Sequence, residues 1–194
     1  MPITELALLR LNAGTSLSTP ALRSALLHAK SLMQTYTNRS FYYLQQIEDP
    51  SLIYVLGEWD SLEQHMRDFI PEEENQAVLK SLEGRLGVEW LMHVGVGHAQ
   101  LPVPVGGEAV WNVCRYFVKE GERKEFLDAV EACRKGLGEG VGGGWRVDGV
   151  EGREEFVMFV LGGGEGDGPN GELGLEIENG VEGVEMRGAR VLDI

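Results

Sequence analysis

Short apolar runs of strand length alternate with longer segments that have apolar residues at helical spacing. In the first half of the chain the strand-like runs are residues 3–11, 40–48, 52–59 and 88–96. A stripe from Leu22 to Tyr36 predicts a helix after the first run, and Leu62, Met66, Phe69 and Ile70 predict one after the third. This order, β-α-β-β-α-β, predicts a ferredoxin-like unit.

Capping residues mark the start of the helical region between the third and fourth strands. Asp60 and Ser61 are both good N-caps, and Glu63 or Gln64 completes a capping box from either one. Pro71 is suited to open a second helix, because its missing N–H would be unpaired in a first turn. Two helical segments are therefore expected between these strands.

The same order of elements starts again after a linker rich in glycine and proline. The second set of elements comprises strands at 109–118, 141–150, 154–161 and 183–192 and a helix at 120–137. We therefore predict a first unit at 1–97, a linker at 98–107 and a second unit at 108–194.

Three short matches measure the repeat: Arg10 with Arg115 and 55–57 with 160–162 at a separation of 105 residues, and 87–89 with 183–185 at 96. The second unit is therefore nine residues shorter (105 − 96) between its third and fourth strands. The segment that remains there, 162–180, is rich in glycine, which costs about 1 kcal/mol in a helix relative to alanine. We predict that it lacks the long helix of the first unit.

The pattern "LGEWDS…H…FIPEEENQ…L…GVEW…H" runs through residues 56–93. It resembles the fungal antibiotic-biosynthesis monooxygenase (ABM) domains of the dimeric α/β-barrel superfamily. The resemblance covers most of 3–96, and a thinner version, including "VKEGERKEF", covers 109–161. It implies that two ferredoxin-like sheets face each other and enclose a barrel. Because this chain carries both units, the predicted fold is α+β, with two tandem ferredoxin-like units forming the barrel within one chain and a degenerate second unit.

Strand alternation separates the side chains of 88–96 into two faces. Trp90, Met92 and Val94 form an apolar face that we expect to meet the helices, which would turn Glu89 and His93 into the barrel. A histidine and a carboxylate lining a cavity can act as acid and base. Four positions along a strand separate them by ~13 Å, so they would touch one ligand rather than each other. The alternative is a structural histidine and an arginine-paired glutamate.

His65 follows the Trp59-Asp60-Ser61 turn, where the resembled family often has a histidine, so it is a second catalytic candidate at the cavity mouth. The alternative is a partly exposed helix residue. Aromatic and cationic residues that could bind a substrate are Tyr43, Trp59, Trp111, Arg115 and Trp145. Core packing is the commoner use of such aromatic residues. For Arg115 and its repeat partner Arg10, the alternative is a structural salt bridge to Glu89 or Glu185.

The net charge of the chain argues against some classes of binding partner. The chain has 31 acidic and 17 basic residues and a net charge of −14, which argues against nucleic acid or an anionic membrane as a partner. No apolar run approaches the ~20 residues that span a bilayer, and the first ten residues lack a secretory pattern. Cys114 and Cys133 are expected to be free thiols in a reducing compartment. We therefore predict a cytoplasmic protein.

Several motifs are absent from the sequence. No Cys/His spacing suggests zinc, no glycine cluster leads into a helix as a phosphate loop does, and no serine nucleophile elbow is present. We therefore predict neither a metal nor a cofactor.

The resemblance implies a cofactor-independent monooxygenase that acts on a phenolic or polyketide-like molecule of secondary metabolism, with His93 or His65 as base. A cyclase, isomerase or decarboxylase would need the same base without oxygen, and a haem-degrading relative would use either histidine as an iron ligand. A non-catalytic small-molecule-binding or stress-related barrel is a third class. The expected partner is a small hydrophobic or aromatic molecule, and a homodimer through the outer surfaces stays open.

Overall fold

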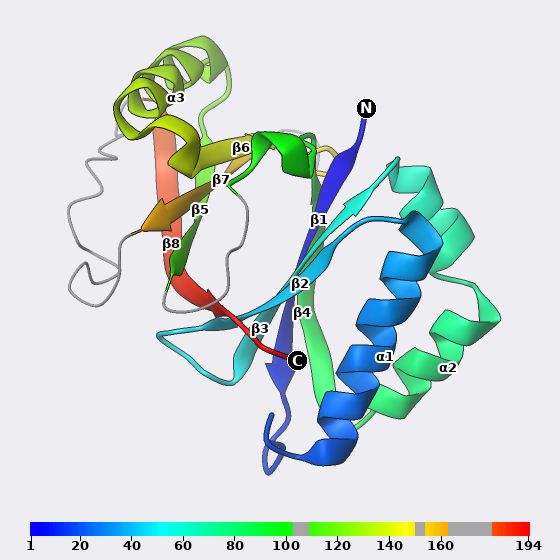
Figure 1. Ribbon diagram of the computed structural model, residues 1–194. Helices are drawn as coiled ribbons and strands as arrows, with labels where there is room; N and C mark the ends of the chain where they lie inside the picture. The colour runs from blue at the N-terminus through cyan, green and yellow to red at the C-terminus, as the bar shows by residue number, and fades with distance from the viewer. Residues whose placement is uncertain (103–108, 150–153, 163–179) are drawn as a thin grey trace.

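The computed structural model describes residues 1–102, 109–149, 154–162 and 180–194 (Figure 1). Among them, eight strands form one antiparallel sheet in the order β4-β1-β3-β2-β8-β5-β7-β6. The strands are β1 (Ile3–Leu11), β2 (Phe41–Gln46), β3 (Leu52–Trp59), β4 (Leu86–Val94), β5 (Val110–Val118), β6 (Val141–Trp145), β7 (Glu154–Gly162) and β8 (Val181–Val191). The two halves of the sheet have the same strand order, so the predicted α+β class with ferredoxin-like topology is confirmed.

The sheet closes on itself where β4 meets β6. Val94 and Arg146 form an antiparallel bridge there, flanked by backbone hydrogen bonds from Gly95 N to Trp145 O (2.8 Å) and from Val147 N to His93 O (2.9 Å). On the other side of the barrel, β2 pairs with β8 through three residue pairs. The eight strands therefore enclose one barrel within one chain.

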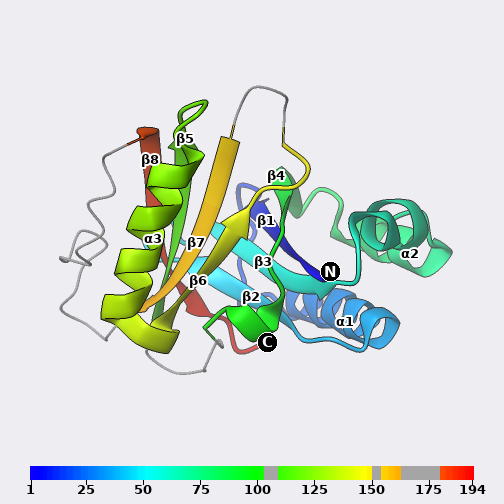
Figure 2. The ribbon, with the colours of Figure 1, turned by 90° about the horizontal axis from the view of Figure 1, so that it is seen from above.

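Helices cover the outside of this barrel on two sides. The described helices are α1 (Pro20–Thr37), a π-helix η1 (Gln64–Phe69), α2 (Glu73–Leu82), α3 (Arg123–Leu137) and the short 3-10 turns η2 (His98–Gln100) and η3 (Gly138–Gly140). Helices α1 and α2 lie against the first half of the sheet, and α3 lies against the second half (Figures 1 and 2). None of the described helices has the length and apolar character needed to cross a bilayer. Apart from its end residues, the segment 162–180 lies outside the described residues.

The barrel interior is filled by packed side chains. Its core includes Leu6, Leu8, Leu56, Met92, Val94, Trp111, Val113 and Phe159. A second core lies between the first half of the sheet and its helices, and includes Ala7, Leu22, Leu26, Ile53, Trp59 and Phe69. The side chains of each strand therefore alternate between the barrel and the helices.

The predicted faces of β4 are wrong. Trp90, Met92 and Val94 pack inside the barrel, and Leu91 packs on the helix side. At the end of this strand, residues 91–94, both faces are covered, so hydrophobicity does not tell the two faces apart. His93 therefore points toward the helices rather than into the barrel.

The structure shifts the predicted correspondence between the last strands of the two halves, β4 and β8, by one residue. Leu6 pairs with Met92 and Trp111 pairs with Ala189, so the separation at this level is 97 rather than 96. A slip of one residue exchanges the two faces of a strand. Arg190, and not Ala189, is therefore the counterpart of His93.

Close packing against β6 makes Gly142 sensitive to substitution. A Cβ atom on Gly142 would meet backbone atoms of Gln100 and Leu101, which cannot rotate away. We expect Gly142→Ala to lower the free energy of unfolding by about 1–3 kcal/mol, the usual cost of overpacking, measured by urea denaturation. Gly87→Ala is the matched control, because a Cβ atom there meets nothing within 4 Å. Equal losses in the two variants would contradict this explanation.

Candidate functional site

A cavity of about 840 Å³ lies between the first half of the sheet and helices α1 and α2. Most of its wall is apolar and includes Ala7, Leu9, Leu26, Met33, Phe69 and Leu91. Glu5 and His65 are the buried acid–base groups in its wall, whereas the other charged residues that line it, Glu73, Lys80 and Glu83, are exposed. Its size is in the range of pockets that hold small organic molecules. It lies on the opposite face of the sheet from the predicted cavity, and the barrel side holds a smaller one of about 200 Å³ that Leu8, Tyr54 and Arg115 help to line.

The π-helix η1 turns His65 toward this cavity. Ser61 Oγ accepts a hydrogen bond from Gln64 N (3.1 Å), which is one half of the predicted capping box, while Gln64 Oε1 accepts from Asp60 N (2.8 Å) rather than from Ser61 N. The π-turn closes between Ile70 N and His65 O (3.0 Å). His65 is 2% exposed, and its ring stacks on Trp59 with centroids 4.1 Å apart. The interpretation of His65 as a partly exposed helix residue is therefore wrong.

Glu5 is a buried carboxyl group in the middle of β1. It is 5% exposed and lies on the same strand face as Ala7 and Leu9. One of its oxygens accepts a hydrogen bond from Trp59 Nε1 (2.7 Å). Burial raises the pKa of Glu5 to about 7, although the Trp59 hydrogen bond and the proximity of His93 lower it. The group therefore changes its charge near neutral pH.

His65 and Glu5 lie close together but do not form an ion pair at rest. His65 Nε2 is 3.7 Å from Glu5 Oε2, which is longer than a hydrogen bond. Burial, and to a lesser extent nearby His93, lower the pKa of His65 to about 3. At neutral pH, burial thus favours an uncharged imidazole beside a carboxyl group that is about half protonated.

Behind His65, a hydrogen-bonded chain leads out of the cavity. His65 Nδ1 is 2.7 Å from His93 Nε2, and His93 Nδ1 is 2.8 Å from Asp148 Oδ2. His93 is fully buried. Burial alone would raise the pKa of Asp148, but hydrogen bonds from His93 and Arg146 outweigh it and lower the pKa to about 2. Asp148 is therefore ionised at neutral pH, and it ends the hydrogen-bonded chain that runs from His65 through His93.

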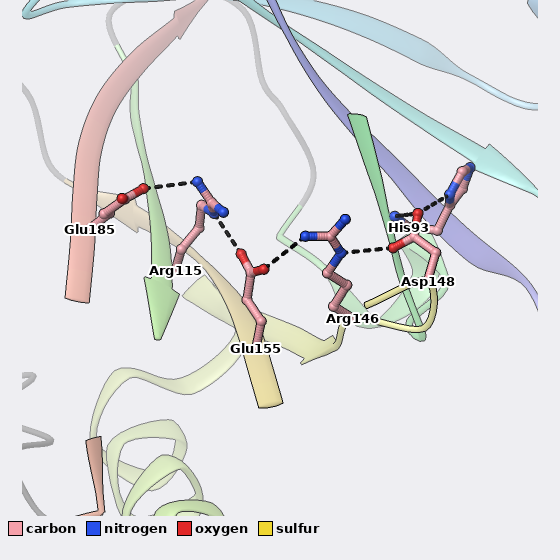
Figure 3. A network of polar contacts seen from close by, with 6 residues as sticks. All are labelled: His93, Arg115, Arg146, Asp148, Glu155 and Glu185. Carbon is pink, nitrogen blue, oxygen red and sulfur yellow. Dashed lines mark hydrogen bonds and ion pairs between the residues drawn. The ribbon is translucent and has the colours of Figure 1, made fainter. Parts of the chain in front are cut away.

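Asp148 begins a longer network of alternating charges (Figure 3). Its other oxygen accepts a hydrogen bond from Arg146 Nε (2.9 Å), and Arg146 also bonds Glu155 (3.1 Å). Arg115 then bridges Glu155 (2.6 Å) and Glu185 (2.8 Å). The network runs from the buried histidines to the half-exposed Glu185.

The structure gathers four of the predicted site residues around the cavity. His65 and Tyr43 line it, Trp59 lies under the His65 ring, and His93 is hydrogen-bonded to His65. The Tyr43 hydroxyl donates to the Leu26 carbonyl (3.1 Å). Their roles in binding or catalysis stay a prediction.

The other four predicted residues lie elsewhere. Glu89 is half-exposed and accepts a 2.6 Å hydrogen bond from Arg10, as the alternative interpretation expected. Trp111 packs inside the barrel, Arg115 belongs to the charge network, and Trp145 packs on Phe126 and Phe156 beside α3. None of these four lines the cavity of the first half.

Sequence reasoning missed Glu5 and Asp148. Glu5 had a signal, because it is a charged residue within an otherwise apolar strand at 3–9. Asp148 had no such signal. It lies 55 residues after His93 in the sequence, and the two meet only because β4 pairs with β6. Within the described ranges, no group of three or more His, Cys, Asp or Glu side chains is arranged to hold a metal ion.

Two ferredoxin-like sheets close around one core and form a barrel within this one chain. Solved structures agree with this fold. A Fusobacterium nucleatum protein provisionally assigned as a monooxygenase is 10% identical, with a TM-score of 0.68 over 98% of this chain and 92% of its own. A haem-binding protein from Thermus thermophilus is 13% identical, with a TM-score of 0.62 over 99% and 91%. An anthrone oxidase-like protein is 16% identical, with a TM-score of 0.58 over 98% and 91%.

At these identities the similarity shows the fold alone. No protein-family model matches the chain, and no curated protein matches it either. The predicted α+β barrel of two ferredoxin-like units is thus confirmed as a fold, and its chemistry has to be argued from the cavity.

Proposed function

We propose that this protein is a cofactor-independent monooxygenase that oxidises a phenolic or polyketide-like molecule in the cavity of the first half. The observation that carries the proposal is the pairing of Glu5 with His65 at the wall of an apolar cavity. Burial shifts the pKa of both groups toward the uncharged form, to about 7 and about 3. Such a pair is suited to take a proton from a weakly acidic substrate near neutral pH.

The chemistry follows from that proton transfer. The Glu5–His65 pair removes a proton from an activated C–H or O–H group and leaves a delocalised carbanion or phenolate. This anion reduces O₂ by one electron, and the resulting radical and superoxide combine to form a hydroperoxide at carbon. The hydroperoxide loses water to leave a carbonyl group, with the pair returning the proton. A CH₂ group and O₂ thus become C=O and H₂O, and the substrate itself supplies the electrons.

The apolar cavity wall contributes in two ways. It offers apolar contacts to an aromatic skeleton, and the burial of Glu5 and His65 strengthens electrostatic interactions between them and a bound anion. The neighbours described as a monooxygenase and as anthrone oxidase-like support the choice of reaction to test.

An oxygen electrode provides the test. We expect O₂ uptake with anthrones, hydroquinones or naphthols, one O₂ per substrate, and ¹⁸O from ¹⁸O₂ in the product carbonyl. Substrate consumption that continues without O₂ would instead indicate the cyclase, isomerase or decarboxylase class, which uses the same base. Binding in the cavity without turnover of any of these compounds would favour a non-catalytic carrier.

A further inference from the structure

Asp148 belongs to the second half of the chain but completes the site in the first half. It lies just after β6, at the seam where β4 and β6 close the barrel. Its Oδ2 atom accepts two hydrogen bonds from His93, one from the backbone N (3.1 Å) and one from Nδ1 (2.8 Å). Figure 3 shows the carboxylate turned toward the imidazole.

These contacts determine which nitrogens carry protons. An ionised carboxylate only accepts hydrogen bonds, so His93 must carry its proton on Nδ1. In the state in which His93 is uncharged, its Nε2 is a lone pair, and His65 donates to it from Nδ1. In the uncharged state His65 is left with a lone pair on Nε2, the atom nearest Glu5. The tautomer assigned from this network places a proton acceptor at the cavity wall.

The rest of the network holds Asp148 in place without carrying protons further. Arg146 occupies the second oxygen of Asp148 and is itself tied to Glu155. An arginine does not give up its proton in proteins, so a proton relay ends at Asp148. Beyond that point, Glu155, Arg115 and Glu185 act as an electrostatic support.

The arrangement exists at one seam of the barrel only. By strand pairing, Arg190 in β8 matches His93, as shown above. Tyr43 pairs with Val55 and Val141 pairs with Val160, which sets β2 and β6 98 residues apart. By this offset Pro50 matches Asp148. The second seam has no imidazole at the matched position, and its carboxylate contact joins Glu48 Oε1 to the backbone N of Gly188 (2.8 Å). The imidazole pair with its carboxylate thus lies on the side of the first-half cavity.

We infer that the second half of the chain regulates the proposed site through Asp148, which acts as a positioning residue that fixes the tautomers of His93 and His65. This inference rests on the proposed function only for its effect on turnover, since the tautomers can be observed without a substrate. In this view the second half contributes a fixed negative charge and a hydrogen-bond acceptor to the cavity of the first half.

Asp148→Asn tests the inference directly. Arg146 and His93 bond different oxygens of Asp148, and an amide has only one oxygen. We expect this oxygen to face Arg146, because a charged donor forms the stronger hydrogen bond. The NH₂ group then faces His93, whose backbone N–H loses its acceptor. His93 Nδ1 can accept from this NH₂ group only if its proton moves to Nε2, which reverses the donor and acceptor of the His93–His65 bond. His65 would present an N–H to Glu5 instead of a lone pair.

Imidazole ¹⁵N chemical shifts give the readout, in a chain with only four histidines. We expect protonated Nδ1 on His93 and His65 in the unaltered protein, and protonated Nε2 on both in Asp148→Asn. Asp148→Ala should give a mixture of tautomers, which formate should return to the original state because Asp148 is partly open to solvent. Unchanged tautomers in both variants would overturn the inference, whatever the outcome of the oxygen assay.

Turnover supplies the second readout once a substrate is known. Asp148→Asn is expected to reduce kcat roughly 10- to 100-fold, the usual effect of removing a group that orients a functional side chain. Formate should restore part of the activity of Asp148→Ala. Glu185→Gln is the matched control, since it removes a carboxylate from the same network without touching a histidine. A loss in Glu185→Gln as large as in Asp148→Asn would mean that the network acts on general stability rather than on the tautomers.

Discussion

Replacing His65 by glutamine is expected to reduce kcat by roughly 10²–10⁴-fold, the range for loss of a general acid or base. Gln64 and Ser61 should still cap the π-helix, and the glutamine side chain can still lie against Trp59. It cannot accept and return a proton at the position of Nε2. The measurement is steady-state O₂ uptake, with KM and kcat determined separately.

His98→Gln is the matched control for this variant. His98 is also partly buried, but it lies in η2 and does not line the cavity. We expect its kcat to stay within about twofold of the original. A His65→Gln protein that folds normally and keeps its kcat would rule out His65 as part of the proton-transfer pair. A change in KM alone would assign it to substrate binding.

Local patterns were sufficient to predict the elements of this fold. The apolar runs of strand length and the stripe from Leu22 to Tyr36 depend only on neighbours in the chain, and the corresponding strands and α1 are present. The π-helix was not predictable in this way. Its i→i+5 turn leaves Leu62 and Met66 exposed and buries His65 and Phe69, the reverse of the predicted stripe for three of these four residues.

The site depended on information that the sequence does not display. His65 and His93 were identified as separate candidates, but their hydrogen bond joins a π-helix to the helix-side face of β4. Both faces of β4 carry apolar residues, so the sequence did not show which face meets the helices. The repeat was also aligned one residue out of register, and this favoured the wrong face. The contact with Asp148 also requires the closure of the barrel between the two halves. Residue type therefore indicated chemistry, whereas long-range strand register determined which residues meet.

The second large effect is expected from Glu5→Gln, which should make the protein more stable above neutral pH. The folded-state pKa of Glu5 is about 7, against 4.5 for the free group. Between these values the unfolded chain has released the proton while the folded chain still holds it. Stability from this group is therefore fully present below about pH 4.5 and lost as the pH rises through about 7. The loss amounts to about 3 kcal/mol, since each pKa unit is worth about 1.4 kcal/mol.

Glutamine has nearly the shape of a protonated glutamate, and its carbonyl oxygen can still accept the hydrogen bond from Trp59 Nε1. Urea unfolding of both proteins should give similar free energies at about pH 4.5. At about pH 8 the variant should be more stable by about 3 kcal/mol. Glu63→Gln, an exposed carboxylate on the same half of the chain, should show no such divergence. Parallel pH curves for Glu5→Gln and the original protein would mean that Glu5 titrates normally.

The same variant separates stability from catalysis. The charged and ionisable groups around Glu5 are His65, His93 and the Tyr43 hydroxyl. If Glu5 and His65 share the proton taken from the substrate, kcat/KM should rise with pH through an inflection near 7 that belongs to the pair. In Glu5→Gln this inflection should vanish and the rate should fall even as stability increases. If the variant is more stable but its pH profile is unchanged, the buried Glu5 affects stability only, and His65 by itself is the proton acceptor.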